Sequence, residues 1–301
     1  MHPLAIIVAV RRRFPVQAVA ITALALAIVG IGVSAQATRP MQRVAVNGAE
    51  LEYEVSGSGE PVLLIHGTGV ATTFYPTMTE AALSGYRLIR YHRRGWAGSS
   101  RTTPPFLISD HAADAAALLK ALGVQKAHIV GHSFGASTAL QLALDNPALV
   151  HDIIIIEPPV FNPDGPSPFA AMDAQYRSGD KAGALNAFST GSYGADWRTL
   201  SARVPGGPAQ VERDVDTMFL TESPSMAVWR FQAAEGARIT QPILYLTSGT
   251  RHGNSRNTLQ PIITQMEQQV LPGVTHAMLM ENPKVVADAI AAFIKKHPLT
   301  Q

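Results

Sequence analysis

The sequence predicts an α/β protein with a doubly wound, mostly parallel sheet and a helical segment inserted late in the chain. Three observations support this. Short apolar runs alternate with helix-like segments, an order typical of parallel sheets covered on both faces. The eighty residues 161–240 interrupt this alternation before the last apolar run. A glycine-flanked serine, Gly131-His132-Ser133-Phe134-Gly135, separates one apolar run from the next helix-like segment.

The predicted elements follow in chain order. Apolar residues alternate with polar or small ones from 44 to 55, on both sides of Asn47-Gly48, which predicts a β-hairpin. Further strands, most of them buried on both faces, are expected at 61–65, 86–91, 127–130, 153–156 and 243–246, with a short one at 269–271. Helices are expected at 110–122, 134–145 and 283–295.

The domain organisation follows from these elements. We expect residues 41–160 and 241–301 to form the α/β core and residues 161–240 to form a helical cap. The inserted segment opens with several prolines and contains helix-like stretches at 180–188 and 211–220.

The first 37 residues have the features of an export signal. A charge-free run from Val16 to Ala35 follows three arginines and ends in Ala35-Gln36-Ala37, a pattern typical of signal peptidase sites. We expect cleavage before Thr38 and a periplasmic or secreted protein. Because the run approaches the length that spans a bilayer, an uncleaved membrane anchor is the alternative. Either outcome places the folded domain outside, since the arginines precede the apolar run.

Composition excludes several classes of protein. With 301 residues, 47% of them apolar and 15% charged, the chain can bury a large core and is not disordered. The net charge is +2 and the only basic run lies in the N-terminal segment, so no nucleic-acid partner is expected. The absence of cysteine excludes disulfides, thiolate catalysis and cysteine-based zinc sites. No histidine pair has metal-ligand spacing, and neither a metal nor an organic cofactor is implied.

Ser133 is the candidate nucleophile. A G-x-S-x-G motif between a strand and a helix exposes its serine on a strained turn. Glycines two residues before and after the serine leave room where a Cβ atom would collide. The helix that begins at Phe134 directs the positive end of its dipole toward the charge that develops during acyl transfer.

Two further segments complete the candidate site. His66-Gly67-Thr68-Gly69 follows the strand at 61–65, so the backbone N–H groups of Thr68 and Phe134 are the predicted oxyanion hole. We expect His66 itself to be structural. His276 lies in a loop before the last helix, the late position from which a general base reaches the serine.

From about Ala45 to its C-terminus the chain resembles the capped, serine-nucleophile α/β-hydrolase family. The resemblance rests on four features: the G-x-S-x-G motif around Ser133, which is called the nucleophile elbow in this family, the His66-Gly67 turn, the pair Arg94-Gly95, and His276 ahead of Glu281-Asn282-Pro283. It implies the α/β-hydrolase fold and serine-based hydrolysis. In two places the chain departs from the family pattern: residues 248–252 contain no acid where members often carry an aspartate, and His92 replaces an aspartate before the Arg-Gly pair.

Glu157 is the candidate third member of a triad. It ends the apolar run 153–156, where some members of the family place their acid, and the order Ser133, Glu157, His276 fits this fold. A carboxylate that emerges from four isoleucines needs a partner, which an imidazolium supplies. The alternatives are a surface glutamate at 157 and an acid from the cap, such as Asp164 or Asp173.

These residues predict hydrolysis of a carboxylic ester or lactone through an acyl-enzyme. Aromatic residues are frequent in the cap segment, which favours a small apolar acyl or aromatic substrate. A carbon-carbon bond hydrolase, a cofactor-free perhydrolase and a non-catalytic ligand-binding protein are the alternatives. Serine in place of aspartate argues against dehalogenase and epoxide hydrolase chemistry, which the resemblance ties to a carboxylate nucleophile.

Overall fold

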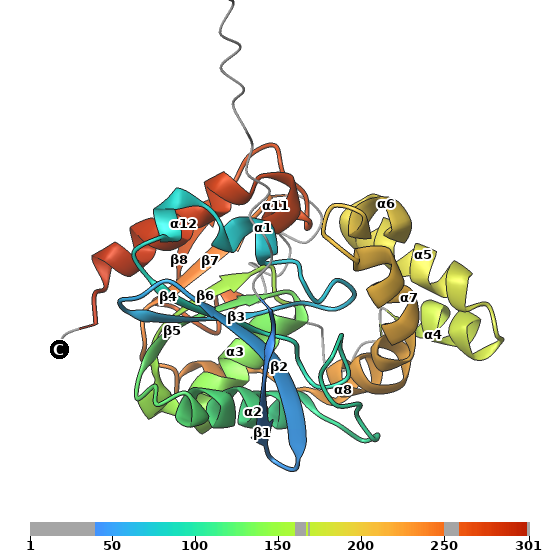
Figure 1. Ribbon diagram of the computed structural model, residues 1–301, viewed down its shortest axis with the longest axis horizontal. Helices are drawn as coiled ribbons and strands as arrows, with labels where there is room; N and C mark the ends of the chain where they lie inside the picture. The colour runs from blue at the N-terminus through green and yellow to red at the C-terminus, as the bar shows by residue number, and fades with distance from the viewer. Residues whose placement is uncertain (1–39, 160–166, 168, 250–258, 300–301) are drawn as a thin grey trace, which may run out of the picture. The chain divides into compact units, whose positions relative to one another are not determined.

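The computed structural model describes residues 40–159, 167, 169–249 and 259–299, so the segment 1–37, predicted from the sequence to be an export signal or anchor, lies outside the described residues. Eight strands form one sheet in the order β1-β2-β4-β3-β5-β6-β7-β8 (Figure 1). Strand β2 is antiparallel to both of its neighbours, β1 and β4. The remaining neighbouring pairs, from β4 and β3 to β7 and β8, are parallel. The strands are β1 (Gln42–Val46), β2 (Ala49–Ser56), β3 (Pro61–Ile65), β4 (Arg87–Tyr91), β5 (Ala127–His132), β6 (Val150–Ile156), β7 (Ile243–Thr247) and β8 (Glu267–Val270).

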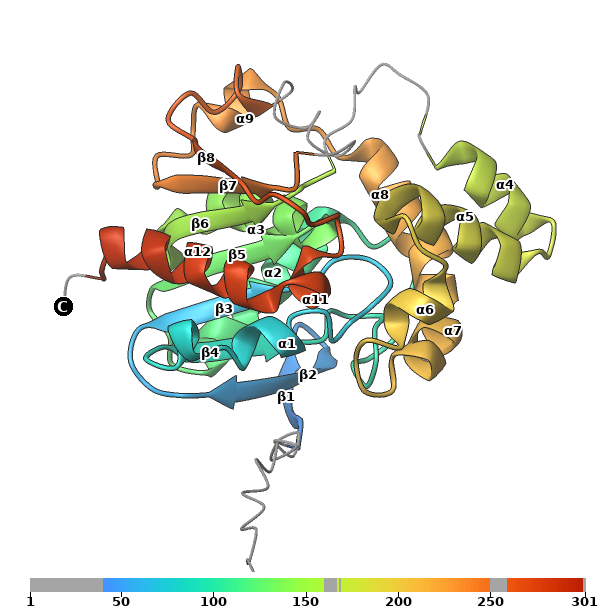
Figure 2. The same ribbon diagram turned by 90° about the horizontal axis from the view of Figure 1, so that it is seen from above.

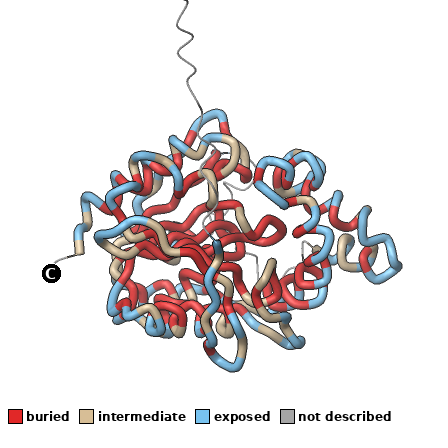
Figure 3. Tube along the Cα trace, in the orientation of Figure 1, coloured by how far each residue is buried: buried red, intermediate tan, exposed pale blue. Residues whose placement is uncertain are grey.

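Helices cover both faces of the sheet, which confirms the predicted doubly wound fold (Figure 2). One face carries α2 (Ile108–Ala121) and α3 (Phe134–Asp145), and the other carries α1 (Tyr75–Met78), α11 (Met278–Glu281) and α12 (Pro283–Lys296). Successive strand residues alternate between these layers: Ile153 packs with α2 and α3, whereas Ile154 packs with α12. The central strands are therefore mostly apolar, and their residues are largely buried (Figure 3).

The predicted hairpin is present. Its strands meet at Val46 and Ala49, and Asn47 and Gly48 both have positive φ, at 48° and 73°. A two-residue turn of this kind needs left-handed conformations that asparagine and glycine tolerate.

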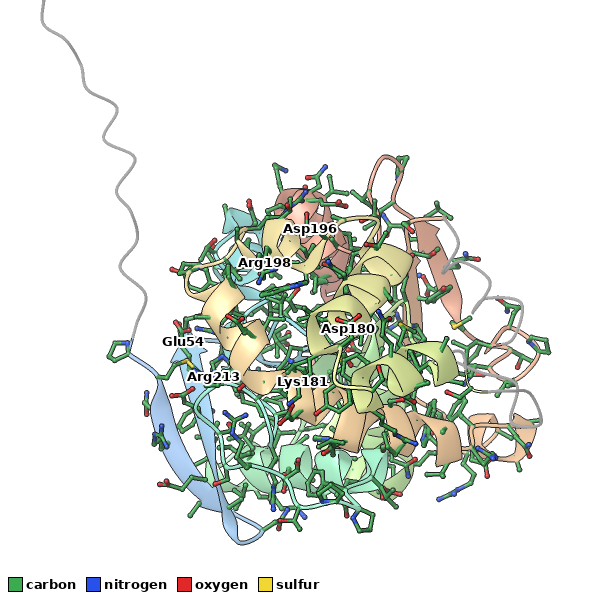
Figure 4. The ribbon with its side chains drawn as sticks, turned by 90° about the vertical axis from the view of Figure 1, so that its right-hand side faces the viewer. Glu54, Asp180, Lys181, Asp196, Arg198 and Arg213 are labelled. Atoms are coloured by element: carbon green, nitrogen blue, oxygen red, sulfur yellow. The ribbon has the colours of Figure 1, made fainter. Side chains whose placement is uncertain are left out.

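Between β6 and β7 the described residues form a series of helices joined by short turns. We call the helices α4 to α8, with the turn between α7 and α8, the cap: α4 (Ala170–Arg177), α5 (Lys181–Tyr193), α6 (Trp197–Ser201), α7 (Gly207–Thr217), a π-helical turn (Met218–Glu222) and α8 (Ser223–Val228). Asp180 and Asp196, labelled in Figure 4, begin α5 and α6 by accepting hydrogen bonds from backbone N–H groups.

The chain leaves the cap before the boundary expected at residue 240. Phe231 and Ile239 pack in the same core cluster as α2 and α3, and the short helix α9 (Ala233–Gly236) lies between them. Within the described ranges, no helix has both the length and the apolar character needed to cross a bilayer.

Candidate active site

Ser133 lies on a strained turn between β5 and α3. Its φ and ψ are 53° and −125°, a region that residues with a Cβ atom rarely adopt. The Ser133 N–H donates a hydrogen bond of 2.8 Å to the Ile156 carbonyl, which fastens the turn to the end of β6. The residue is largely buried, with 8% of its surface exposed.

The flanking glycines are required for close packing. A Cβ atom on Gly131 would lie 2.3 Å from the Gly135 carbonyl oxygen. A Cβ atom on Gly135 would lie 2.1 Å from the Ile65 carbonyl oxygen at the end of β3. Both separations are far below van der Waals contact, which gives the steric reason for the motif.

Residues 66–71, which carry Thr68 and which we call the oxyanion loop, lie against the nucleophile. A Cβ atom on Gly67 would lie 2.8 Å from the Ser133 Cβ atom, so the backbone before Thr68 touches the elbow. Among the described residues, no acceptor takes up the N–H of Thr68 or of Phe134. Both donors therefore remain available for an oxyanion.

His66 supports this loop, as the sequence predicted. Its Nε2 accepts the Arg93 backbone N–H at 2.9 Å, so the ring proton is on Nδ1, which donates to the Gly67 carbonyl at 2.7 Å. Burial and the neighbouring Arg93 charge hold the pKa of His66 well below its ordinary value. A neutral His66 with both nitrogens occupied has no part in proton transfer.

His276 lies in the loop between β8 and α11. Its Nδ1 is 2.7 Å from Glu157 Oε2, and because a carboxylate only accepts, the proton is on Nδ1. With the proton on Nδ1, His276 Nε2 carries the lone pair that a general base needs. His132 Nε2 donates to the His276 carbonyl at 2.9 Å, and the centroids of the two rings lie 4.7 Å apart. The loop that carries His276 therefore packs on the elbow.

Glu157 directly follows β6 and is held on both sides. Its N–H donates to the Leu246 carbonyl at 3.2 Å, and its φ of 44° turns the chain at the sheet edge. Oε1 accepts from the Thr247 hydroxyl at 3.1 Å, and from the Ser248 N–H and hydroxyl at 2.8 and 2.6 Å. The hydrogen bond expected between Glu157 and His276 is thus present.

Burial alone would raise the pKa of the Glu157 carboxyl. The hydrogen bond and charge of His276, together with the two Ser248 donors, outweigh burial and lower that pKa to about 2. The Glu157 carboxyl is therefore an anion near neutral pH.

Of the two alternative acids, the structure describes Asp173 alone. It accepts a hydrogen bond of 2.7 Å from Ser223 inside the cap, and Asp164 lies outside the described residues. Among the residues that the structure describes, no group of three or more histidine, aspartate or glutamate side chains could hold a metal ion.

A family model described as the alpha/beta hydrolase family matches residues 62–289, which is most of the chain. The chain belongs to the alpha/beta hydrolase family. The match includes the elbow, Glu157 and His276.

Several curated proteins similar in sequence to this hydrolase are also named as hydrolases. RutD of Azorhizobium caulinodans, named as a carbamate hydrolase, is 36% identical over 108 residues, which are 36% of this chain and 41% of RutD. The chain thus spans about two fifths of the length of such curated relatives.

Solved structures share the fold. Est816, described as an N-acyl homoserine lactone degrading enzyme, has a TM-score of 0.67 at 23% identity over 84% of this chain and 100% of its own. The enol-lactonase of Burkholderia xenovorans LB400 has a TM-score of 0.67 at 19% identity, with the same coverage of 84% and 100%.

The sequence left the missing aspartate of this hydrolase unexplained. Ser248 stands where family members often carry that acid, and it donates two hydrogen bonds to Glu157. The acid comes from the end of β6, and the residue after β7 holds it in place. No local signal in the sequence identifies this role, because a serine after a strand has many possible partners.

His92, the other departure, is structural. Its Nδ1 lies 2.8 Å from Glu52 Oε2, and burial lowers its pKa from the ordinary value. Two further residues have no role predicted from the sequence: His132, which bonds to the His276 carbonyl, and Glu222, which bonds to Thr68.

Proposed function

We propose that this hydrolase cleaves a carboxylic ester or lactone through an acyl-enzyme on Ser133. One observation carries the proposal: His276 donates its Nδ1 proton to the buried Glu157 carboxylate. The His276 carbonyl accepts a hydrogen bond from His132, the residue before Ser133 on the strained elbow. This arrangement prepares Nε2 to accept the serine proton.

The reaction follows from these positions. Ser133 Oγ attacks the substrate carbonyl carbon while its proton moves to His276 Nε2, and the N–H groups of Thr68 and Phe134 bind the oxyanion. Collapse of the tetrahedral intermediate breaks the bond between the carbonyl carbon and the alcohol oxygen, and the leaving alkoxide takes the proton from His276. In a lactone the resulting alcohol stays attached to the acyl chain. Water then attacks the acyl-enzyme with His276 as base, which releases the acid and restores Ser133. The Glu157 anion stabilises the imidazolium in both halves.

The side chains around the elbow favour an apolar substrate. Phe134 packs with Ile108 and Met226, and Phe169 from the cap borders this cluster. Apolar surroundings of this kind at Phe134 support a small acyl or aromatic substrate. The similar proteins described above, a carbamate hydrolase, an N-acyl homoserine lactone degrading enzyme and an enol-lactonase, support a test on esters, lactones and carbamates.

A substrate panel tests the proposal. Aryl and alkyl esters of graded acyl length, lactones and aryl carbamates should be assayed with the purified protein, and we expect turnover of esters or lactones that rises with acyl length before it falls. Turnover restricted to carbon-carbon cleavage of diketones, or to peracid formation from a carboxylic acid and hydrogen peroxide, would identify the other chemistries of the same triad. Binding without turnover would indicate a ligand-binding protein.

We also propose that the enzyme is exported. The support is the charge-free run that follows the arginines and ends at Ala35-Gln36-Ala37. N-terminal sequencing of protein from the native host should yield Thr38. An intact Met1 in the membrane fraction would identify an anchor, and an intact Met1 in the cytosol would contradict export.

A further inference from the structure

Three side chains of the cap form hydrogen bonds with the oxyanion loop, residues 66–71. The Tyr193 hydroxyl donates to the Thr68 carbonyl at 3.1 Å. Gln210 donates to the Gly69 carbonyl at 3.2 Å and accepts the Ala71 N–H at 3.0 Å. The Thr68 hydroxyl donates to the Glu222 carboxylate.

Glu222 also acts on the loop through Arg93. Both side chains are fully buried, and their ion pair offsets the cost of burying each charge. Arg93 Nε donates to the His66 carbonyl at 2.9 Å, and one of its terminal nitrogens donates to the Gly67 carbonyl at 3.0 Å. The Trp96 indole donates to the same Glu222 oxygen as Arg93, at 2.7 Å.

The Gly67 carbonyl matters because it belongs to the peptide group that carries the Thr68 N–H. In a trans peptide the C=O and N–H point in opposite directions. Arg93 and the His66 ring hold the Gly67 oxygen on one side, so the Thr68 N–H is directed to the other. The direction of a predicted oxyanion donor is therefore set by an arginine that a cap carboxylate holds.

Tyr193 connects this loop with the general base. Its ring lies 4.9 Å from the His276 ring, with 41° between the planes, while its hydroxyl is bonded to Thr68. Burial raises the pKa of the Tyr193 hydroxyl, so it stays a protonated donor. One cap side chain thus contacts both parts of the site that must act together during acyl transfer.

We infer that the cap sets the position of the oxyanion hole, with Tyr193, Gln210 and Glu222 as its positioning residues. The inference rests on the proposed acyl-enzyme mechanism and adds that the cap is part of the catalytic arrangement rather than a cover above it. The contribution should appear in the transition state, because only there does the substrate oxygen carry the charge that the Thr68 N–H stabilises.

The test uses two mild variants and a matched control. Tyr193→Phe keeps the ring on His276 and removes the bond to Thr68, and Thr68→Val removes the bond to Glu222 while the buried ion pair with Arg93 stays. Thr217→Val is the control: it removes a cap-to-core hydrogen bond of 2.7 Å, from Thr217 to the Gly95 carbonyl, that does not involve the oxyanion loop. Arg101 still donates to that carbonyl, so no buried acceptor is left alone.

Kinetics should separate the variants. Loss of a whole oxyanion donor lowers kcat by about 10²–10³, so displacement of one should lower it by about 10-fold in Tyr193→Phe and Thr68→Val, with KM little changed. The rate at which a fluorophosphonate labels Ser133 should fall in parallel, because the phosphonyl oxygen occupies the same hole. Thr68→Ser, which keeps the hydroxyl, should retain most of the rate.

Thermal unfolding supplies the comparison with a purely structural role. Thr217→Val should lose as much stability as Tyr193→Phe and keep the wild-type kcat and labelling rate. If Tyr193→Phe and Thr68→Val slow catalysis no more than Thr217→Val does, the inference is overturned. Failure of the proposed function is a separate result, since it would appear as turnover that persists without the Ser133 hydroxyl.

Discussion

Replacement of Ser133 by alanine should abolish both hydrolysis and labelling by a fluorophosphonate. Nucleophile, base and acid act as a unit, so loss of the nucleophile alone is expected to lower kcat by up to about a millionfold. The change removes one hydroxyl from a residue whose backbone bond to Ile156 stays in place, so the fold should not change. Steady-state kinetics on the best substrate of the panel, with mass spectrometry of the labelled protein, gives both readouts.

Ser137 provides the matched control. It lies one turn further along α3, is fully buried, and donates to the Pro159 carbonyl at 3.4 Å. Ser137→Ala should label and turn over like the wild type. Hydrolysis that persists in Ser133→Ala would rule out the covalent mechanism, and labelling at another residue would move the nucleophile elsewhere.

Replacement of Glu157 by glutamine should lower kcat by about four orders of magnitude without unfolding the protein. Glutamine has nearly the same size and can still accept hydrogen bonds from Ser248, but it carries no charge to stabilise the His276 imidazolium. Its amide group can also donate to Nδ1, which would place the ring proton on Nε2 and block proton transfer from Ser133. Asp173→Asn, which neutralises the cap acid bonded to Ser223, should retain the wild-type rate.

The same variant tests the ionisation of Glu157 through stability. The carboxyl has a pKa of about 2 in the fold against an ordinary 4.5, so its ionisation favours the folded state. That contribution is complete above pH 4.5 and is lost as the pH falls toward 2. The excess unfolding free energy of wild type over Glu157→Gln, from urea titrations, should therefore shrink across this interval. A difference independent of pH would contradict an anionic Glu157.

A near-native rate in Glu157→Gln would leave Ser133 and His276 as a dyad. Loss of rate together with loss of folding would call for Ser248→Ala as a milder change. That variant removes one of the hydrogen bonds to Glu157 Oε1 and keeps the bond to His276, so the pKa of the Glu157 carboxyl should rise while the triad stays connected.

The sheet and its helices were predictable because burial imposes a local pattern. The strand at Pro61–Ile65 and the helix at Phe134–Asp145 have the predicted bounds. The strand predicted at 153–156 begins three residues earlier, at Val150. The apolar pattern did not reveal this start, because the strand contains Asp152, which is polar yet fully buried. His128 on the neighbouring strand lies 2.9 Å from its carboxylate, a partner that hydrophobicity alone does not reveal.

The contact of the acid with the base was also predictable, although 119 residues separate Glu157 from His276. Parallel strands end at one edge of the sheet, so a carboxylate that directly follows β6 has few other places to lie. The part played by Ser248 was not predictable in the same way, since a serine after a strand has many possible partners. Its role depends on the separation between the ends of β6 and β7.

By itself the sequence determined the sheet, the elbow and the order of the three candidate triad residues, because glycine sterics and apolar periodicity are properties of short segments. Only the tertiary structure decided how the cap meets the core. Glu222 is separated from Arg93 by 129 residues and from Thr68 by 154, and neither contact follows from a local pattern. Such bonds form only where remote helices and loops pack at one spacing, and that spacing is a property of the whole fold.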